Sequence, residues 1–339
     1  MATKQPQLGL MRLVLRASQF SRKGFTLIEL LVAMVVGSLI IGTLLYLVVE
    51  LLQVNRREEV LTQTQQDMQR AIDYISRDAR EAVLVFSTPG AVIDQLDDLP
   101  TGATPILAFW RLDPINLENT NNFWKNSCST AFSGTSAKQV AKRSECETLK
   151  LRQSFYTLVV YLQQNNKDGE LWEGPSRILR YELPKYSSKP NITSLTQTQG
   201  YWDPTAKDNS FLDWSKASTA VDETVTPGST SGNVAVLTDY VDSLGNDPST
   251  ASACPIGYFA TPAQSNSFYA CVSNEAAQAA AVLDPNAIPS GTNQSLLIFL
   301  RGNATEGRPG LVNTFSEAGR TPTLEAEILI RGILDKSGS

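Results

Sequence analysis

The chain has 339 residues, a formal net charge of −5 and no histidine. Without imidazole it contains no Ser-His-Asp or Cys-His nucleophilic site, no His ligand for a catalytic zinc ion and no imidazole general base. We therefore expect no enzyme, no catalytic residue and no cofactor. A hydrolase that uses two carboxylates is the remaining enzymatic alternative, but no pair of acids stands out among the many in the chain.

Residues 1–24 form a basic segment that precedes a long apolar stretch. The segment has no acidic residue, and its basic residues are Lys4, Arg12, Arg16, Arg22 and Lys23. Its apolar part is too short to span a bilayer, so we interpret it as a leader that is removed. Its removal takes away five positive charges and leaves a net charge of −10. This acidic balance argues against a nucleic-acid partner, which would require a basic surface.

Residues 25–50 are predicted to span a membrane. From Phe25 to Val49 the only charged side chain is Glu29. A helix of this length covers roughly 37 Å, more than the hydrocarbon core of about 30 Å. The basic leader should stay in the cytoplasm, which places residues 87–339 outside it as an ectodomain. A carboxylate inside a span is costly, so we expect Glu29 to have a partner and a function.

The sequence from Gly24 through Phe25, Thr26, Leu27 and Ile28 to Glu29 resembles the class III signal of type IV pilins and pseudopilins. The resemblance implies cleavage after Gly24 by prepilin peptidase and N-methylation of Phe25. It also implies that Glu29 pairs with the terminal amine of a neighbouring pilin or pseudopilin subunit. The expected location is the bacterial inner membrane before assembly, and the fibre afterwards. An ordinary signal anchor is the alternative.

Residues 51–86 are predicted to continue the same helix as its amphipathic half. Apolar side chains recur three and four residues apart, as on one face of a helix, at Met68, Ile72, Ile75, Ala79, Val83 and Phe86. We expect the helix to end near Val85, ahead of Ser87–Gly90. The run Asp73–Arg80 resembles the larger minor pseudopilins, the group that includes W-type minor pilins and J-type pseudopilins. A solvated helix face with local ion pairs is the alternative.

Beyond the helix the pattern changes to strands, which predicts an α+β, pilin-like fold. The helix should pack on an antiparallel sheet of four to seven strands. The clearest hairpin joins Phe155–Gln163 to Ser176–Leu183. The other predicted strands are Ile106–Leu112, Val234–Leu237, Gln294–Arg301 and Leu324–Ile333, and a short helix is predicted at Asn274–Leu283. Residues 116–147 are interpreted as a polar insertion.

Two polar segments raise the question of ligands. The turn at Asn165–Gly169 resembles a calcium loop, but Pro175 stands where the closing glutamate should be, so we predict no metal. Residues 184–232 are predicted to be a loop, and Trp202 and Trp214 are its large apolar side chains. These tryptophans could contact a glycan or a partner, although pinning the loop to the domain is the commoner role.

The four cysteines, Cys128, Cys146, Cys254 and Cys271, all follow the predicted span. On the oxidising side of the membrane we expect two disulfides, and three pairings are possible. Cys128 with Cys146 and Cys254 with Cys271 is favoured, because each pair closes a short polar loop. Free thiols in a reducing compartment are the alternative.

Together these features predict a minor pilin or pseudopilin that serves motility or secretion. An ectodomain as large as residues 87–339 is awkward to repeat along a tight fibre, so we expect the subunit at the tip or in the priming complex. A type IV pilus, a type II secretion system and hormogonium polysaccharide secretion all remain open. The alternative from another functional class is a membrane-anchored ectodomain that binds carbohydrate or a surface through the loop of Trp202 and Trp214.

Overall fold

The computed structural model describes most of the chain from Gly24 onwards. The described residues are 24–115, 127–167, 169–172, 174–189, 192, 195–206, 209–217, 225–244, 252–273, 294–304 and 321–330. The chain divides into two compact units, Met1–Arg56 and Arg57–Ser339, and each is described by itself. In the first unit, residues 1–23 of the predicted leader lie outside the described part.

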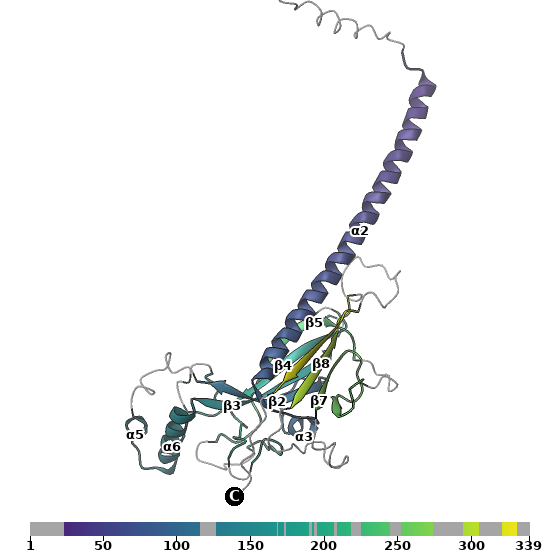
Figure 1. The fold of residues 1–339 in the computed structure, drawn as a ribbon. Helices are drawn as coiled ribbons and strands as arrows, with labels where there is room; N and C mark the ends of the chain where they lie inside the picture. The colour runs from purple at the N-terminus through teal and green to yellow at the C-terminus, as the bar shows by residue number, and fades with distance from the viewer. Residues whose placement is uncertain are drawn as a thin grey trace, which may run out of the picture. The chain divides into compact units, whose positions relative to one another are not determined.

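Helix α2 (Leu27–Arg80) is continuous and contains no proline (Figure 1). Its first turn is capped by Thr26, whose Oγ1 accepts a hydrogen bond of 3.4 Å from the Glu29 amide. A window of 18 residues in this helix has a mean hydropathy of 2.5, and none of that window is buried inside the protein. The apolar side chains of the first unit therefore need a bilayer or other chains to cover them.

The second unit corrects the predicted end of this helix. Helix α2 ends at Arg80 rather than near Val85, and strand β1 (Ala82–Val85) follows it. Ala82 and Val85 join one apolar core, whereas Leu84 joins the core on the opposite face of the sheet. A strand within a layered fold buries side chains on both of its faces, whereas a surface helix buries only one stripe. The segment therefore gains more burial as a strand.

A five-stranded antiparallel sheet forms the larger layer of the second unit, in the order β1-β2-β3-β4-β5. Its further strands are β2 (Thr104–Pro114), β3 (Ser154–Asn165), β4 (Ser176–Pro184) and β5 (Asn233–Val241). The predicted hairpin is confirmed as β3 and β4, in which Val160 lies opposite Tyr181. The strands predicted at Ile106–Leu112 and Val234–Leu237 are confirmed as parts of β2 and β5.

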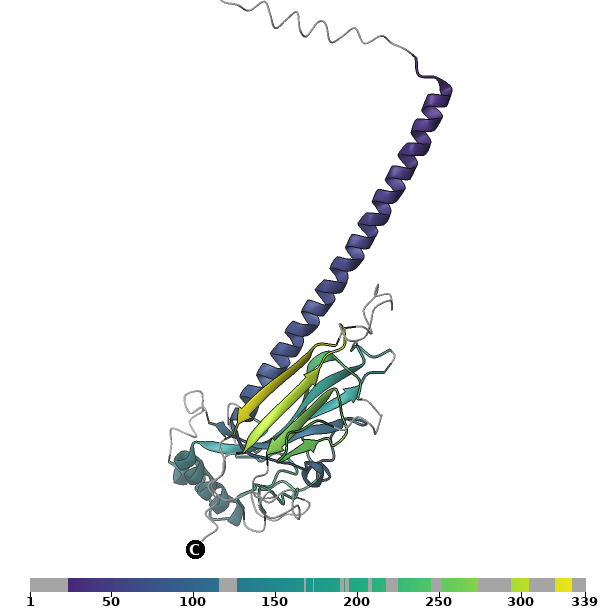
Figure 2. The same ribbon diagram turned by 45° about the vertical axis from the view of Figure 1, so that its right-hand side comes forward.

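A second antiparallel sheet has the order β6-β7-β8-β9, where a single sheet was expected. Its strands are β6 (Tyr258–Thr261), β7 (Phe268–Ser273), β8 (Ser295–Arg301) and β9 (Thr323–Leu329). The sequence predicts β8 and β9, although β9 ends before Ile333. It misses β6 and β7, which are only four and six residues long. Figure 2 shows the green and yellow strands of this sheet in front of the teal strands of the first.

The main core lies where the two sheets and the second half of α2 meet. Buried residues of α2 in this core recur at helical spacing, at Met68, Ala71, Ile72, Ile75 and Ala79. The same cluster contains Phe109 and Tyr161 from the first sheet and Phe268 and Ile298 from the second. The structure thus confirms the α+β class, with a long N-terminal helix, antiparallel sheets and two disulfides.

The predicted polar insertion contains two helices, α5 (Cys128–Ala131) and α6 (Ala137–Arg152). Helix α6 is capped by Ser136 at its start and by Gln153 at its end, and Gln153 adopts the left-handed conformation with φ of 54°. This turn passes the chain directly into β3. Apart from Pro184, the last residue of β4, and a bridge between Tyr186 and Gln197, the described part of residues 184–232 contains no helix or strand. The helix predicted at 274–283 lies outside the described residues.

Candidate functional site

The N-terminal motif leaves its side chains exposed. Gly24 precedes the helix and has no atom within 4 Å of the position that a Cβ would take. Phe25 is 78% exposed. Thr26 Oγ1 lies 3.5 Å from Glu29 Oε2, and within the described residues Glu29 forms no ion pair. Among the described residues nothing crowds Gly24, and the Glu29 carboxylate is available to a partner.

A buried ionic cluster joins the end of α2 to the first sheet. Asp78 accepts hydrogen bonds from Arg180 Nε at 2.8 Å and from Tyr161 Oη at 2.6 Å, and it also pairs with Arg111. The Asp78 side chain is 4% exposed. Burial by itself raises the pKa of Asp78, but the bonds and charges of Arg180 and Arg111 outweigh it, so the pKa is lowered.

The cluster continues along the sheet in matched pairs. Arg111 Nε donates a hydrogen bond of 2.6 Å to Asp113, and Arg180 donates one of 2.5 Å to Glu182. Lys189 pairs with both Asp113 and Glu182. Burial raises the pKa of each of these two carboxyls, but the neighbouring cations outweigh it and lower the pKa. All three acids of the cluster are thus paired and ionised near neutral pH. This state suits a role in holding the helix to the sheet better than a role in donating protons.

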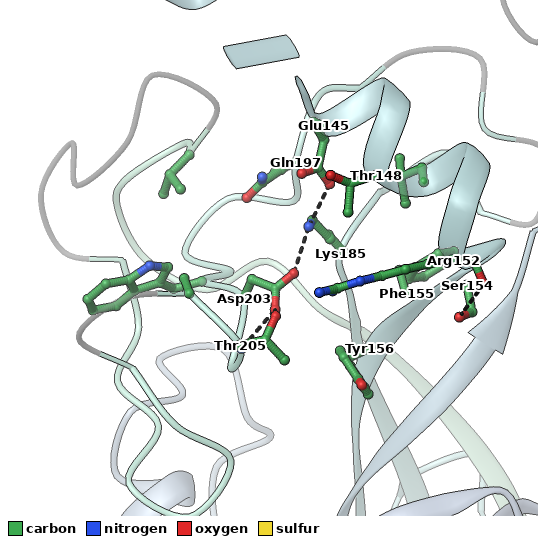
Figure 3. A pocket seen from close by; sticks show the side chains of 14 residues that line it. Glu145, Thr148, Arg152, Ser154, Phe155, Tyr156, Lys185, Gln197, Asp203 and Thr205 are labelled. Carbon is green, nitrogen blue, oxygen red and sulfur yellow. Dashed lines mark hydrogen bonds and ion pairs between the residues drawn. The ribbon is translucent and has the colours of Figure 1, made fainter. Parts of the chain in front are cut away.

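A pocket lies between α6, the start of β3 and the loop around residue 203 (Figure 3). Its volume is about 210 Å³. Lys185 lies at its base, with Nζ 2.6 Å from Glu145 Oε1 and 2.7 Å from Asp203 Oδ2. Asp203 Oδ1 accepts hydrogen bonds from the amide and the hydroxyl of Thr205, at 2.9 and 2.7 Å. Figure 3 shows the guanidinium of Arg152 pointing into this space.

The pocket holds its charges in a fixed state. Burial lowers the pKa of Lys185, but the charges of Glu145 and Asp203 outweigh this effect and raise it. Burial raises the pKa of Asp203, but Lys185 and Thr205 outweigh it and lower the pKa. Burial also raises the pKa of Tyr156. At neutral pH the lysine is charged and Asp203 is ionised, so Asp203 is a poor general acid.

The structure separates the two tryptophans of the loop. Trp214 is 3% exposed and packs edge-on against Trp110, with ring centroids 5.7 Å apart. Its indole N–H donates to the Trp202 carbonyl at 2.6 Å. Trp202 is half-buried and lines the pocket. Trp214 therefore pins the loop, as its commoner role suggests, and only Trp202 keeps a surface for a ligand.

The cysteines form disulfides in the two pairs favoured by the sequence, Cys128–Cys146 and Cys254–Cys271. The first joins α5 to α6, and the second joins β7 to the segment that precedes β6. The described residues contain no group of three or more acidic or cysteine side chains placed to hold a metal ion. In the pocket, Lys185 bridges the two carboxylates of Glu145 and Asp203.

The comparison with known families concerns the start of the chain. Residues 20–45 match the family described as the prokaryotic N-terminal methylation motif. This match supports a type IV pilin-like protein. It covers Gly24, Phe25 and Glu29, and such a motif implies processing by prepilin peptidase and assembly with other pilins. It also fits anchoring in the inner membrane. No curated protein and no solved structure matches the chain.

Sequence reasoning found the N-terminal motif but missed both buried clusters of the second unit. The alternative interpretation of Asp73–Arg80 as a solvated helix face does not hold for Asp78, which is buried in the ionic cluster. Glu145, Lys185 and Asp203 lie on α6, at the end of β4 and in a loop. Their spacing in the sequence matches no motif that would indicate a shared site. The one available signal was Trp202, an aromatic side chain in a polar loop.

Proposed function

We propose that the chain is a minor pilin or pseudopilin, matured by prepilin peptidase and built into a type IV pilus or pseudopilus. The observation that carries the proposal is the methylation motif at residues 20–45. It stands at the head of a helix whose apolar first part is not covered by any of the described residues. Packing of such helices against one another in a fibre would provide that cover.

In this proposal Glu29 directs assembly. After cleavage, the terminal amine on Phe25 of an incoming subunit is a cation. Burying this cation in an apolar surrounding without a partner costs free energy. A carboxylate of a neighbouring subunit offsets that cost, and its own desolvation is offset in turn. The Glu29 carboxylate is exposed, accepts a bond only from Thr26 and forms no ion pair within the described residues, which is consistent with this role.

We propose that the subunit lies at the tip of the fibre or in its priming complex, and the size of its second unit supports this position. The second unit, Arg57–Ser339, carries two sheets, two disulfides and the helices α5 and α6. Such a bulky unit is hard to repeat in a closely spaced helical array, whereas a tip subunit has no neighbour above it. The fibre would serve motility or the secretion of protein or polysaccharide.

The test is the N-terminal residue of the protein purified from its own membranes, determined by mass spectrometry. The proposal predicts N-methylated Phe25. The Gly24→Ala variant should accumulate as the full-length precursor, because the proposal requires a glycine, with no Cβ, directly before the cleaved bond. A wild-type protein that begins at Met1, or mature-length Gly24→Ala protein, would contradict the proposal and favour an anchored ectodomain.

Position in the fibre needs a second measurement. Quantitative mass spectrometry of sheared fibres should find this subunit at a small fraction of the major pilin, together with other minor pilins. A copy number comparable to that of the major subunit would contradict the tip position, while leaving the processing prediction untouched.

A further inference from the structure

We propose that the pocket between α6, β3 and the loop around Asp203 binds a neutral saccharide unit of a glycan. The inference goes beyond assembly into a fibre and rests on the second unit alone. The pocket is a concave space with a volume of about 210 Å³, bordered by aromatic and polar side chains (Figure 3). Small-ligand sites are concave spaces of about 300–1,000 Å³; this pocket is smaller and more polar than most of them, which suits a single small polar unit.

The charges of the pocket select against charged ligands. Glu145 and Asp203 contribute two negative charges, and Lys185 and Arg152 contribute two positive ones. An anion attracted by Arg152 would meet two carboxylates, and a cation would meet two basic groups. A neutral ligand avoids both repulsions, because it leaves the bridge from Lys185 to Glu145 and Asp203 intact.

Hydrogen-bonding groups in the pocket suit hydroxyl groups. Within the described residues, Glu145 uses Oε1 for Tyr186 and Lys185, and its Oε2 has no partner. The Arg152 guanidinium forms no ion pair with any described residue and presents several donors. Each hydroxyl of a sugar can donate to a carboxylate and accept from a guanidinium at the same time. A polyol therefore satisfies acceptor and donor together, which a purely apolar ligand cannot do.

Aromatic side chains provide the apolar part of the site. Trp202 and Tyr156 line the pocket and are half-buried. The C–H groups of a pyranose ring carry partial positive charge, and they are attracted to the negative face of an aromatic ring. The Trp202 backbone is held by the indole of Trp214, so this wall is fixed before a ligand arrives.

The other wall is held by covalent and hydrogen bonds. Glu145 immediately precedes Cys146, whose disulfide with Cys128 fixes α6 to α5. Tyr186 Oη donates to Glu145 at 2.5 Å and so orients the carboxylate. A preformed site loses less conformational entropy on binding. Because the carboxylates are locked to Lys185, binding without hydrolysis is the expected outcome.

The test is saturation-transfer NMR on the full-length protein in a polyoxyethylene detergent, which has no sugar headgroup. The probes are the methyl glycosides of glucose, galactose, mannose and N-acetylglucosamine, with glucuronate, glucosamine and glycine as charged comparators. At least one neutral glycoside should bind, and it should bind more tightly than every charged comparator.

Variants connect the signal to the pocket. Arg152→Ala and Trp202→Ala should each weaken binding by about tenfold or more, because a charged hydrogen bond or a stacking face is lost. Trp172→Ala is the matched control, since Trp172 is another partly exposed tryptophan that lies outside the pocket. Arg152 is exposed, so its variant should keep the unfolding temperature of the wild type.

Three outcomes would overturn the proposal. The first is the absence of binding by every neutral glycoside in the panel. The second is binding that Arg152→Ala and Trp202→Ala leave unchanged while both variants remain folded. The third is preferential binding of glucuronate, glucosamine or glycine, which would make this an ionic site. None of these results bears on the N-terminal residue, so the proposed role in a fibre would stand or fall separately.

Discussion

Asp78 Oδ2 accepts a hydrogen bond of 2.8 Å from Arg180 Nε, which joins the last turn of α2 to strand β4 across a sequence separation of 102 residues. The same carboxylate reaches β2 through Arg111 and β3 through Tyr161. One side chain thus fixes the helix to three neighbouring strands. Apolar packing alone allows a helix to slide along a sheet, whereas a buried charge has low energy only where its partners lie.

We predict that Asp78→Asn lowers the free energy of unfolding of the second unit by about 3 kcal/mol. The substitution keeps the volume of the side chain but leaves Arg111 and Arg180 with an excess of buried positive charge. Urea unfolding of the full-length protein in detergent, followed by tryptophan fluorescence, measures the effect. Every described tryptophan lies in this unit.

Asp67→Asn is the matched control on the same helix. Asp67 pairs with Arg70 at 3.2 Å, and the Arg70 side chain is 76% exposed. Exposed pairs of this kind contribute about 0.5 kcal/mol or less. Equal losses in the two variants would show that the buried cluster does not fix the helix to the sheet.

Acid should destabilise the second unit through the same cluster. The folded-state pKa values of Asp78, Asp113 and Glu182 lie below their unfolded values of 3.8 for Asp and 4.5 for Glu. A lowered pKa gives stability that is complete above the unfolded pKa and is lost as the pH falls through the folded pKa. We expect a constant urea midpoint above about pH 5.5 and a falling midpoint below about pH 4.5.

The Asp78→Asn variant should show a shallower fall below pH 4.5, because one of the titrating carboxylates is absent. Asp67→Asn should follow the wild-type curve. A wild-type midpoint that rises on acidification would contradict the lowered pKa values of the cluster.

The two disulfides should differ in their access to a reductant. Cys128 and Cys146 are both buried, whereas Cys254 is half-buried and only Cys271 is buried. Thiol exchange requires a thiolate to reach a sulfur atom, so access limits its rate. Under native conditions, alkylation and mass spectrometry should find Cys254 and Cys271 modified before the other pair. The reverse order would show that Cys128 or Cys146 is reached first.

Glu29→Val should be processed normally but assemble poorly. The apolar variant removes the proposed partner of the terminal amine, so that each incoming subunit leaves a cation unpaired in an apolar surrounding. Recovery in sheared fibres should fall by about tenfold or more relative to the wild type, which corresponds to 1.4 kcal/mol or more. Mature-length protein in the membrane should remain at the wild-type amount.

Glu50→Gln controls for the loss of an acidic side chain elsewhere on α2. Glu50 stands at the end of the predicted span, where water can solvate it, so this variant should assemble normally. Equal incorporation of Glu29→Val and wild type would exclude the proposed role of Glu29.

Local patterns in the sequence predict several parts of this fold correctly. The hairpin of β3 and β4 is predicted because both strands are apolar and a polar turn separates them. Cys128–Cys146 and Cys254–Cys271 are the favoured pairs because each closes a short loop. Residues 82–85 are mispredicted because a run of four apolar residues fits a helix or a strand, and pairing with β2 decides between them.

The sequence by itself determined the N-terminal motif, the apolar span and the absence of imidazole chemistry, because each is a property of adjacent residues or of composition. Only the tertiary structure decided that Asp78 is buried among arginines. It also decided that Glu145, Lys185 and Asp203 share one pocket, and that Trp214 is buried while Trp202 is not. These features depend on contacts between segments distant in sequence, and such contacts form only when the strands and helices pack around a common core.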